Sequence, residues 1–274
     1  MTVVDVDAYL RRIGAERPDR IDLDALAHLQ ERHLRSVPFE TIDFNLGLPI
    51  KLGEEALEKI VDRGRGGGCY ELNTAFAVLL RELGYAVDLL PARTLHNGKE
   101  PLLGVHGGHM ILRIDIEDDF WLVDVGFRWA SRSPLRLAER GPQKDENGEY
   151  LIVDGEDGDV VIVHDGVPRI RLETRARETD DFNPTLWWYS TAPESPVTGG
   201  SVWASLVTPT GRVSLLDRTL TRIEDDRVVR EVLDDDAFLA ACRRWFGIDL
   251  DRLPNLPPLP GASPSTGRPA RAQP

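Results

Sequence analysis

The first 84 residues carry apolar side chains at the three- and four-residue spacing of amphipathic helices. Asp22 is placed to cap the first clear helix, which must stop before Pro38 because the residue ahead of a proline avoids helical geometry. Gly64 and Gly84 end two further stripes, as glycines commonly do. The pattern predicts a helical domain over residues 1–84. Its apolar positions are Leu23, Leu26, Leu29 and Leu34, then Leu57, Ile60 and Val61, then Leu72, Phe76, Leu79 and Leu83.

Between residues 85 and 180 the apolar positions change to a period of two, which is typical of strands. The segments HMILRIDI, FWLVDVGF, YLIVD and DVVIVHD are rich in β-branched or aromatic residues and are separated by acidic or glycine-containing turns. Because these segments follow one another closely, they predict an antiparallel sheet or small barrel rather than repeated βαβ units.

The last part of the chain is more varied. Residues 181–200 (DFNPTLWWYSTAPESPVTGG) predict an irregular linker, and residues 202–217 predict a hairpin that is followed by a helix ending near Phe246. Seven of the last 21 residues are prolines, so we expect a mobile tail there. The predicted domains are a helical part over 1–84, a β part over 85–190, a linker and final domain over 191–253, and a proline-rich tail over 254–274.

Composition and charge narrow the possible functions. With 274 residues, 41% of them hydrophobic, the chain can form two or three subdomains around a sizeable core. Its formal net charge of −13 opposes binding to nucleic-acid phosphates. The start, MTVVDVDAYLRR, lacks the regions of a signal peptide, and no apolar run reaches the about 18 residues of a membrane span. We therefore expect a cytoplasmic protein with no nucleic-acid or membrane partner.

The two cysteines, Cys69 and Cys242, lie far apart in the sequence and in different surroundings. A lone pair in a cytoplasmic chain argues against a disulfide framework and against a thiolate metal site. Cys242 recurs with Phe238, Leu239 and Trp245 at helical spacing, which predicts a buried core thiol.

Cys69 follows three glycines in the segment RGGGCYELN and directly precedes the stripe that ends at Gly84. Glycines allow a tight turn, and the unpaired N–H groups of a first helical turn favour a thiolate and can donate to an oxyanion. A cysteine that merely fills space at a glycine-rich helix start is the alternative on local grounds. A phosphate-binding loop is disfavoured because no Gly-Lys-Ser/Thr sequence follows.

A nucleophilic thiolate needs a base and a group that orients the base. His109 opens the strand HMILRIDI, and Asp124 lies in the next one, FWLVDVGF, where a carboxylate is costly to bury without a partner. A hairpin turn at residues 117–119 would make the two strands neighbours, although the sequence leaves their register open. His106 precedes a glycine pair outside the strand and ranks below His109 as the base.

The remaining histidines suggest no further chemistry. His28 and His33 are expected to be solvated on the polar flanks of an early helix. His106 and His109 have a spacing that recurs in some metal sites, but on a strand it directs the two rings to opposite faces. We therefore predict no metal site.

Several motifs together resemble the arylamine N-acetyltransferases. RGGGCYELN resembles the active-site signature of that family, and VPFETIDFNLG resembles the segment ahead of it, with Thr41 in place of the usual Asn. HMILRI and LVDVGF resemble the strands that carry the family's histidine and aspartate, and FNPTLWWYSTAPESP its linker into a third domain. The motifs occur in the same order along most of the chain.

The resemblance implies an α+β fold with an N-terminal helical bundle, a central antiparallel β-barrel and a C-terminal α/β lid around a cysteine-protease-like catalytic core. It also implies a catalytic triad of Cys69, His109 and Asp124. The implied reaction transfers acetyl from acetyl-CoA, through acetyl-Cys69, to an arylamine, hydrazine or arylhydroxylamine. Acetyl-CoA would be a cosubstrate, no cofactor would be bound permanently, and the protein would be a monomer or homodimer.

Residues beside the triad are candidates for substrate contact and support. The predicted substrate-binding residues are Phe39, Tyr70, Gly126 and Phe127, with Trp129 as a further candidate for the cleft wall. Arg65 and Glu71 are interpreted as structural, paired around the glycine turn. Relatives usually continue after Phe127 with a small residue, whereas this chain has Arg128 and Trp129, which are expected to reshape the acceptor pocket.

Three other functions remain open at this point. An amide synthase would use the same triad to release a polyketide chain as a macrolactam onto an internal arylamine. A thiol hydrolase or transglutaminase-like enzyme would also use a Cys-His-Asp triad. A non-catalytic binding module of the same fold would have an unreactive Cys69.

Overall fold

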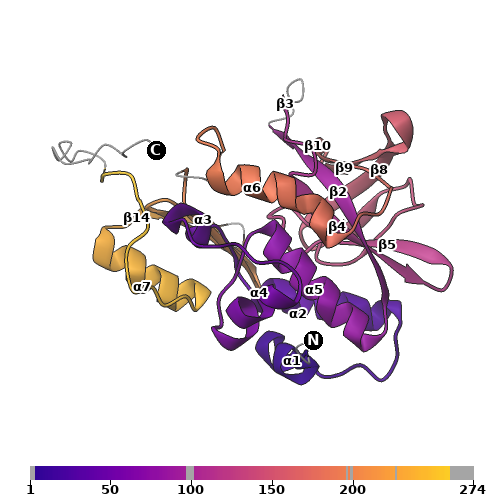
Figure 1. Ribbon diagram of the computed structural model, residues 1–274, viewed down its shortest axis with the longest axis horizontal. Coiled ribbons are helices and arrows are strands. Elements are labelled where there is room, and N and C mark those ends of the chain that lie inside the picture. Colours follow the sequence, from indigo (N-terminus) through magenta and orange to yellow (C-terminus); the bar gives the residue numbers. More distant parts are fainter. Residues whose placement is uncertain (1–3, 97–101, 196, 198–199, 226, 260–274) are drawn as a thin grey trace.

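The computed structural model describes residues 4–96, 102–195, 197, 200–225 and 227–259. Helices of the N-terminal part lie against a strongly curved sheet, and a second sheet with α7 (Asp235–Phe246) lies to the other side (Figure 1). The fold is α+β, as the resemblance implies. In the described part of the chain no helix is both long and apolar enough to cross a membrane.

Two of the helix limits that the sequence predicts are formed by the expected capping residues. Asp22 caps α2 by accepting a hydrogen bond from the Ala25 N–H at 2.9 Å, and Gly84 ends α5 with a φ of 105° that favours glycine. The predicted stripe of Leu57, Ile60 and Val61 is an α-helical turn followed by a π-helical turn. The elements are α1 (Val6–Ile13), α2 (Leu23–Ser36), α3 (Ile42–Leu46), α4 (Glu54–Leu57), η1 (Glu58–Asp62) and α5 (Cys69–Leu83).

His33 is buried in the helical core, so the prediction that it is solvated is wrong. Its ring packs on Phe76 with centroids 4.9 Å apart, and its Nε2 lies 3.1 Å from the Tyr9 hydroxyl. Burial, helped by the nearby charge of Arg12, lowers the pKa of His33 to about 3. The ring is therefore neutral and structural. His28, by contrast, is exposed as predicted.

The central strands form the antiparallel barrel that the sequence predicts. Eight of them follow the order β6-β5-β4-β2-β10-β9-β8-β7, and the Gln143 side chain bonds to the Arg136 backbone between the two end strands. Glu117 and Asp118 have positive φ values in the two-residue turn between β4 and β5, as a tight hairpin requires. The strands are β2 (Ala86–His96), β3 (Leu102–Leu103), β4 (His109–Ile116), β5 (Asp119–Val123), β6 (Leu135–Arg136), β7 (Gln143–Asp145), β8 (Gly148–Asp154), β9 (Val160–His164) and β10 (Val167–Leu172), with the 3₁₀ turn η2 (Glu156–Gly158).

The segment predicted to be an irregular linker contains a helix, which corrects that prediction. The 3₁₀ turn η3 (Thr179–Phe182) leads into α6 (Asn183–Thr191), and Pro184 occupies the first helical turn, where its missing N–H costs nothing. Phe182 and Leu186 are buried, so one side of this short helix joins the core. Figure 1 shows α6 (orange) leading from the barrel toward the second sheet.

The second sheet confirms the hairpin predicted over 202–217 and extends it. Its strand order is β1-β11-β12-β13-β14, and β1 comes from the N-terminal part, with Phe39 opposite Ser205. Phe238 and Cys242 of α7 are fully buried against it, as predicted for that thiol. The strands are β1 (Phe39–Glu40), β11 (Trp203–Thr208), β12 (Gly211–Leu216), β13 (Thr219–Glu224) and β14 (Arg227–Val232).

The start of the predicted mobile tail is anchored to the rest of the protein. Asn255 exchanges hydrogen bonds with Asn45, from its N–H to Oδ1 at 2.7 Å and from its side chain to the Asn45 carbonyl at 3.1 Å. The Pro257 carbonyl accepts from Arg218 Nε at 2.6 Å. Residues 260–274 of the predicted tail lie outside the described residues, and the domain limits stay predictions.

Replacing Phe76 tests the importance of the helical core. Phe76 is fully buried, so Phe76→Ala should lower the free energy of unfolding by about 3–5 kcal/mol. Phe120 is 40% exposed, and Phe120→Ala should cost less than about 1 kcal/mol. Urea denaturation of both variants measures the difference. Equal losses would contradict this description of the core.

Candidate active site

Cys69 is the first residue of α5 and follows a tightly packed glycine turn. A side chain on Gly66 would place its Cβ 1.9 Å from the Pro38 carbonyl oxygen, so only glycine fits there. The Gly68 N–H donates to Glu71 Oε2 at 2.9 Å, which closes the start of the helix. Cys69 is thus in the first turn of α5, as the sequence predicts, where the N–H groups lack partners within the helix and the positive end of the helix dipole lies.

A buried cluster of charges supports the glycine turn. Lys59 Nζ lies 2.9 Å from Glu71 and 2.8 Å from Asp43, while Arg65 lies 2.6 Å from Glu40 and 2.8 Å from Asp43. The predicted pairing of Arg65 with Glu71 is therefore wrong: Lys59 of η1 reaches Glu71, and Arg65 faces β1 and α3. Burial lowers the pKa of Lys59, but the surrounding carboxylates outweigh burial and raise it overall.

His109 and Asp124 lie together in the interior. The His109 Nε2–H group donates to Asp124 Oδ2 at 2.6 Å, and the two residues are 2% and 7% exposed. The β4–β5 register places Leu112 opposite Val123, where the β5 ladder ends. Asp124 is thus just past the strand, rather than within it, and turns toward His109.

Asn73 fixes the carboxylate of Asp124 and was not singled out from the sequence. Its Nδ2 donates to Asp124 Oδ1 at 3.0 Å and to the Met110 carbonyl at 2.9 Å, and its Oδ1 accepts from the Val125 N–H at 3.0 Å. The Gly126 N–H adds a 2.8 Å bond to Asp124 Oδ1. The sequence signal that could have identified Asn73 is its spacing: it is four residues after Cys69 and so lies on the same face of α5.

The surroundings of His109 favour its protonated form. Burial lowers its pKa, but the negative charge and hydrogen bond of Asp124, together with a hydrogen bond to Cys69, raise the pKa to about 10. Because Nε2 is bonded to Asp124, Nδ1 is the ring nitrogen left for Cys69. His109 is therefore a cation at neutral pH that bridges the thiol and the carboxylate.

Cys69 and His109 open into a cleft of about 980 Å³ between the barrel and the second sheet. All four predicted substrate-binding residues line it, and so does Trp129. The Phe127 ring lies 5.2 Å from the His109 ring, centroid to centroid. A Cβ on Gly126 would lie 2.7 Å from Cys69 Cα, so glycine is required for this close approach. The predicted residues are Phe39, Tyr70, Gly126 and Phe127.

Tyr70 has structural contacts that account for its side chain. It is 2% exposed, its hydroxyl donates to the Gly107 carbonyl, and its ring packs against Phe182 and Tyr189. Burial raises the pKa of its hydroxyl, which therefore stays protonated. Contact between this side chain and a substrate stays a prediction.

Tyr189 and Trp203 line the cleft but were not predicted as site residues. Tyr189 comes from α6, in the segment interpreted as irregular, and its hydroxyl donates to the Gly108 carbonyl at 3.1 Å. Burial, together with the charge of nearby Cys69, raises the pKa of Tyr189. The backbone N–H of Trp203 donates to Thr41 Oγ1 at 3.0 Å, so the threonine that replaces the usual Asn helps to join β1 to β11.

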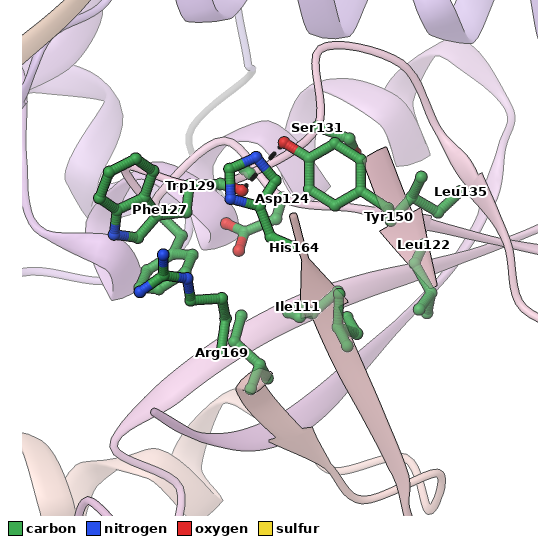
Figure 2. A pocket seen from close by; sticks show the side chains of 13 residues that line it. Ile111, Leu122, Asp124, Phe127, Trp129, Ser131, Leu135, Tyr150, His164 and Arg169 are labelled. Carbon is green, nitrogen blue, oxygen red and sulfur yellow. Dashed lines mark hydrogen bonds between the residues drawn. The ribbon is translucent and has the colours of Figure 1, made fainter. Parts of the chain in front are cut away.

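A second, much smaller pocket lies on the barrel side of Asp124. Figure 2 shows the polar and aromatic side chains that line it, among them Trp129, His164 and Arg169, together with the aliphatic side chains of Ile111, Leu122 and Leu135. Its volume is about 20 Å³, which suits one water molecule rather than a substrate.

His106, the weaker candidate for the base, is 67% exposed and pairs with Glu173 at 3.1 Å, outside the triad. Among the described residues, no three His, Cys, Asp or Glu side chains are grouped in a way that could hold a metal ion.

Comparisons with known proteins agree with this geometry. An N-acetyltransferase family model matches residues 22–254. The arylamine N-acetyltransferase of Mycolicibacterium smegmatis is 35% identical over 262 residues, which cover 91% of this chain and 94% of that protein. The proansamycin X synthase of Amycolatopsis mediterranei is 28% identical over 265 residues, which cover 91% of this chain and 99% of that protein.

A solved structure of Mycobacterium marinum arylamine N-acetyltransferase in complex with CoA has the same fold. It superposes with a TM-score of 0.79 at 28% identity, covering 89% of this chain and 93% of that one. These similarities define the class as an acyltransferase. The chain belongs to the arylamine N-acetyltransferase family.

Replacing Asp124 tests the origin of the protonated histidine. In Asp124→Asn the carboxylate charge is lost while burial remains, so the pKa of His109 should fall from about 10 toward its ordinary value of about 6.5 or below. NMR titration of ¹⁵N-labelled histidines measures it, with exposed His28 as the internal control. An unchanged His109 titration in Asp124→Asn would contradict the assignment.

The raised pKa of His109 also makes the stability of the wild type depend on pH. The stability contributed by this ionisation is present below about pH 6.5 and is lost as the pH rises through about 10.

Proposed function

We propose that this protein transfers acetyl groups from acetyl-CoA to arylamines, hydrazines or arylhydroxylamines by a two-step mechanism through acetyl-Cys69. The observation that carries the proposal is that His109 bridges Asp124 and Cys69 at the helix start inside the cleft. Cys69 is the nucleophile, His109 the acid and base, and Asp124 the group that orients and stabilises the imidazolium.

In the first step the Cys69 thiolate attacks the carbonyl carbon of the acetyl thioester. The bond from carbon to the sulfur of CoA breaks, and the His109 imidazolium gives its proton to the departing thiolate. The first N–H groups of α5 have no partner within the helix and are available to the oxyanion. The products are acetyl-Cys69, neutral His109 and free CoA.

In the second step the acceptor nitrogen attacks the acetyl carbon, His109 takes up the proton of that nitrogen, and the bond from the carbon to Cys69 Sγ breaks. The Cys69 thiolate and the His109 imidazolium are thereby restored. Part of the raised pKa of His109 comes from Cys69, through a hydrogen bond and through charge. Acetylation removes that negative charge, so the pKa of His109 falls and more of the ring is in the neutral form that can accept a proton.

The walls of the cleft suit this chemistry. Phe39, Phe127 and Trp129 line the cleft with the two aromatic residues that the sequence did not predict, Tyr189 and Trp203. Aromatic walls bind a flat acceptor and limit the access of water to the acetyl-cysteine.

The donor and acceptor classes are supported by relatives. The M. marinum relative binds CoA, and the M. smegmatis relative is named for arylamines. A cytoplasmic location and a monomeric or homodimeric state stay predictions.

Amide synthesis is the second candidate, because one relative of high coverage is a synthase by name, the proansamycin X synthase. Such an enzyme would use the same three residues but take a long acyl chain onto Cys69, and the wide cleft leaves room for one.

Intact-protein mass spectrometry after brief incubation with acetyl-CoA tests the proposal. We expect one acetyl adduct on the wild type and none on Cys69→Ala, and addition of an aromatic amine or hydrazine should discharge the adduct into an amide or hydrazide.

The other outcomes separate the alternatives. No adduct on a well-folded wild type would remove acetyl-CoA as the donor and favour the amide synthase. An adduct that is lost to water as fast with amine as without it would indicate a thiol hydrolase.

A further inference from the structure

The cleft carries positive charge in a protein whose formal net charge is −13. Both lining glutamates are already engaged, Glu71 by Lys59 and Glu146 by Arg132. Clefts lined by one sign of charge concentrate ligands of the opposite sign. The lining arginines are Arg128, Arg132, Arg212 and Arg230.

Arg212 of β12 is half-buried and has no carboxylate partner among the described residues. Among the described residues its guanidinium makes one hydrogen bond, from Nη1 to Ser205 Oγ at 3.0 Å, and so uses one of five donors. Burial and the nearby charges of Arg128 and Arg132 lower the pKa of Arg212 to about 10, so its guanidinium is still charged at neutral pH. Holding a charge there without an anion is costly.

Arg128 is held over aromatic rings and also lacks a carboxylate partner within the described part of the chain. Its guanidinium carbon lies 4.5 Å from the centre of the Trp129 ring and 5.6 Å from that of Trp203. Arg169 lies 4.8 Å from the same Trp129 ring. Stacking restricts the guanidinium while leaving its N–H groups free, which prepares it for a planar or tetrahedral anion.

We propose that Arg128 and Arg212 form an anion-binding subsite in the cleft, which takes a phosphate or carboxylate group carried by one of the two substrates. An anion between the two guanidiniums would relieve their mutual repulsion and fill donors that have no partner among the described residues. The inference rests on the proposed function for the identity of the substrates. The two possible sources are the phosphates of CoA and an acidic group on the acceptor.

Binding measurements without turnover test the subsite. Isothermal titration calorimetry compares CoA with pantetheine, which lacks the phosphates, on the wild type, Arg128→Gln and Arg212→Gln. Arg222→Gln is the matched control, because Arg222 stacks on Trp245 and does not line the cleft. If the anion is a CoA phosphate, both test variants should weaken CoA binding about tenfold or more, with pantetheine unchanged and the control near wild type.

Steady-state kinetics with two matched acceptors, the acid para-aminobenzoate and its neutral amide para-aminobenzamide, test the second source. If the anion belongs to the acceptor, both test variants should raise the Michaelis constant for the acid about tenfold and leave the constant for the amide unchanged. For either source, salt should weaken binding of the charged ligand to the wild type more than to the variants.

The subsite is overturned if the variants affect charged and uncharged ligands equally, or neither. Its failure is separable from failure of the proposed function. Loss of CoA affinity in the variants would support the subsite even if Cys69 were not acetylated, whereas normal acetylation with no charge-selective effect would overturn the subsite alone.

Discussion

The buried contact between His109 and Asp124 is the interaction on which the site depends. An imidazolium and a carboxylate are both removed from water there, and the 2.6 Å hydrogen bond offsets that cost only while both partners remain. Removing one partner of such a pair costs about 3–5 kcal/mol in typical proteins. Asn73 and the Gly126 N–H satisfy the other carboxylate oxygen, so the geometry of the pair is fixed from two sides.

Three separate parts of the fold meet at this pair. The helix α5 supplies Cys69, the β4–β5 hairpin and the residue after it supply His109 and Asp124, and the second sheet supplies the opposite wall of the cleft. Two buried links hold them in place: Lys59 of η1 ties Glu71 at the start of α5 to Asp43 of α3, and β1 ties the N-terminal part to β11. The thiol is therefore positioned by groups distant in the sequence as well as by its own helix.

Local signals in the sequence predicted much of this arrangement, because caps, turns and glycine packing act over a few residues: Asp22, Gly84 and the hairpin turn are where they were expected. The misses concern tertiary context. His33 is four residues after Leu29 and so shares the core face of α2, which the spacing allowed but polarity argued against. The helix α6 is apolar on several sides, so its sequence shows no clear helical stripe. The carboxylate partner of Lys59 depends on which elements pack together, which local sequence does not tell.

The central claim is that a protonated His109 activates Cys69, and the rate of thiol alkylation tests it most directly. Wild type and His109→Gln are treated with iodoacetamide at pH 7, and each cysteine is followed by peptide mass spectrometry. Cys242 is the internal control, because burial raises its pKa to about 12 and shields it. We predict that Cys69 reacts about tenfold or more faster in the wild type than in His109→Gln, with Cys242 unmodified in both. Equal Cys69 rates in the two proteins would contradict the account.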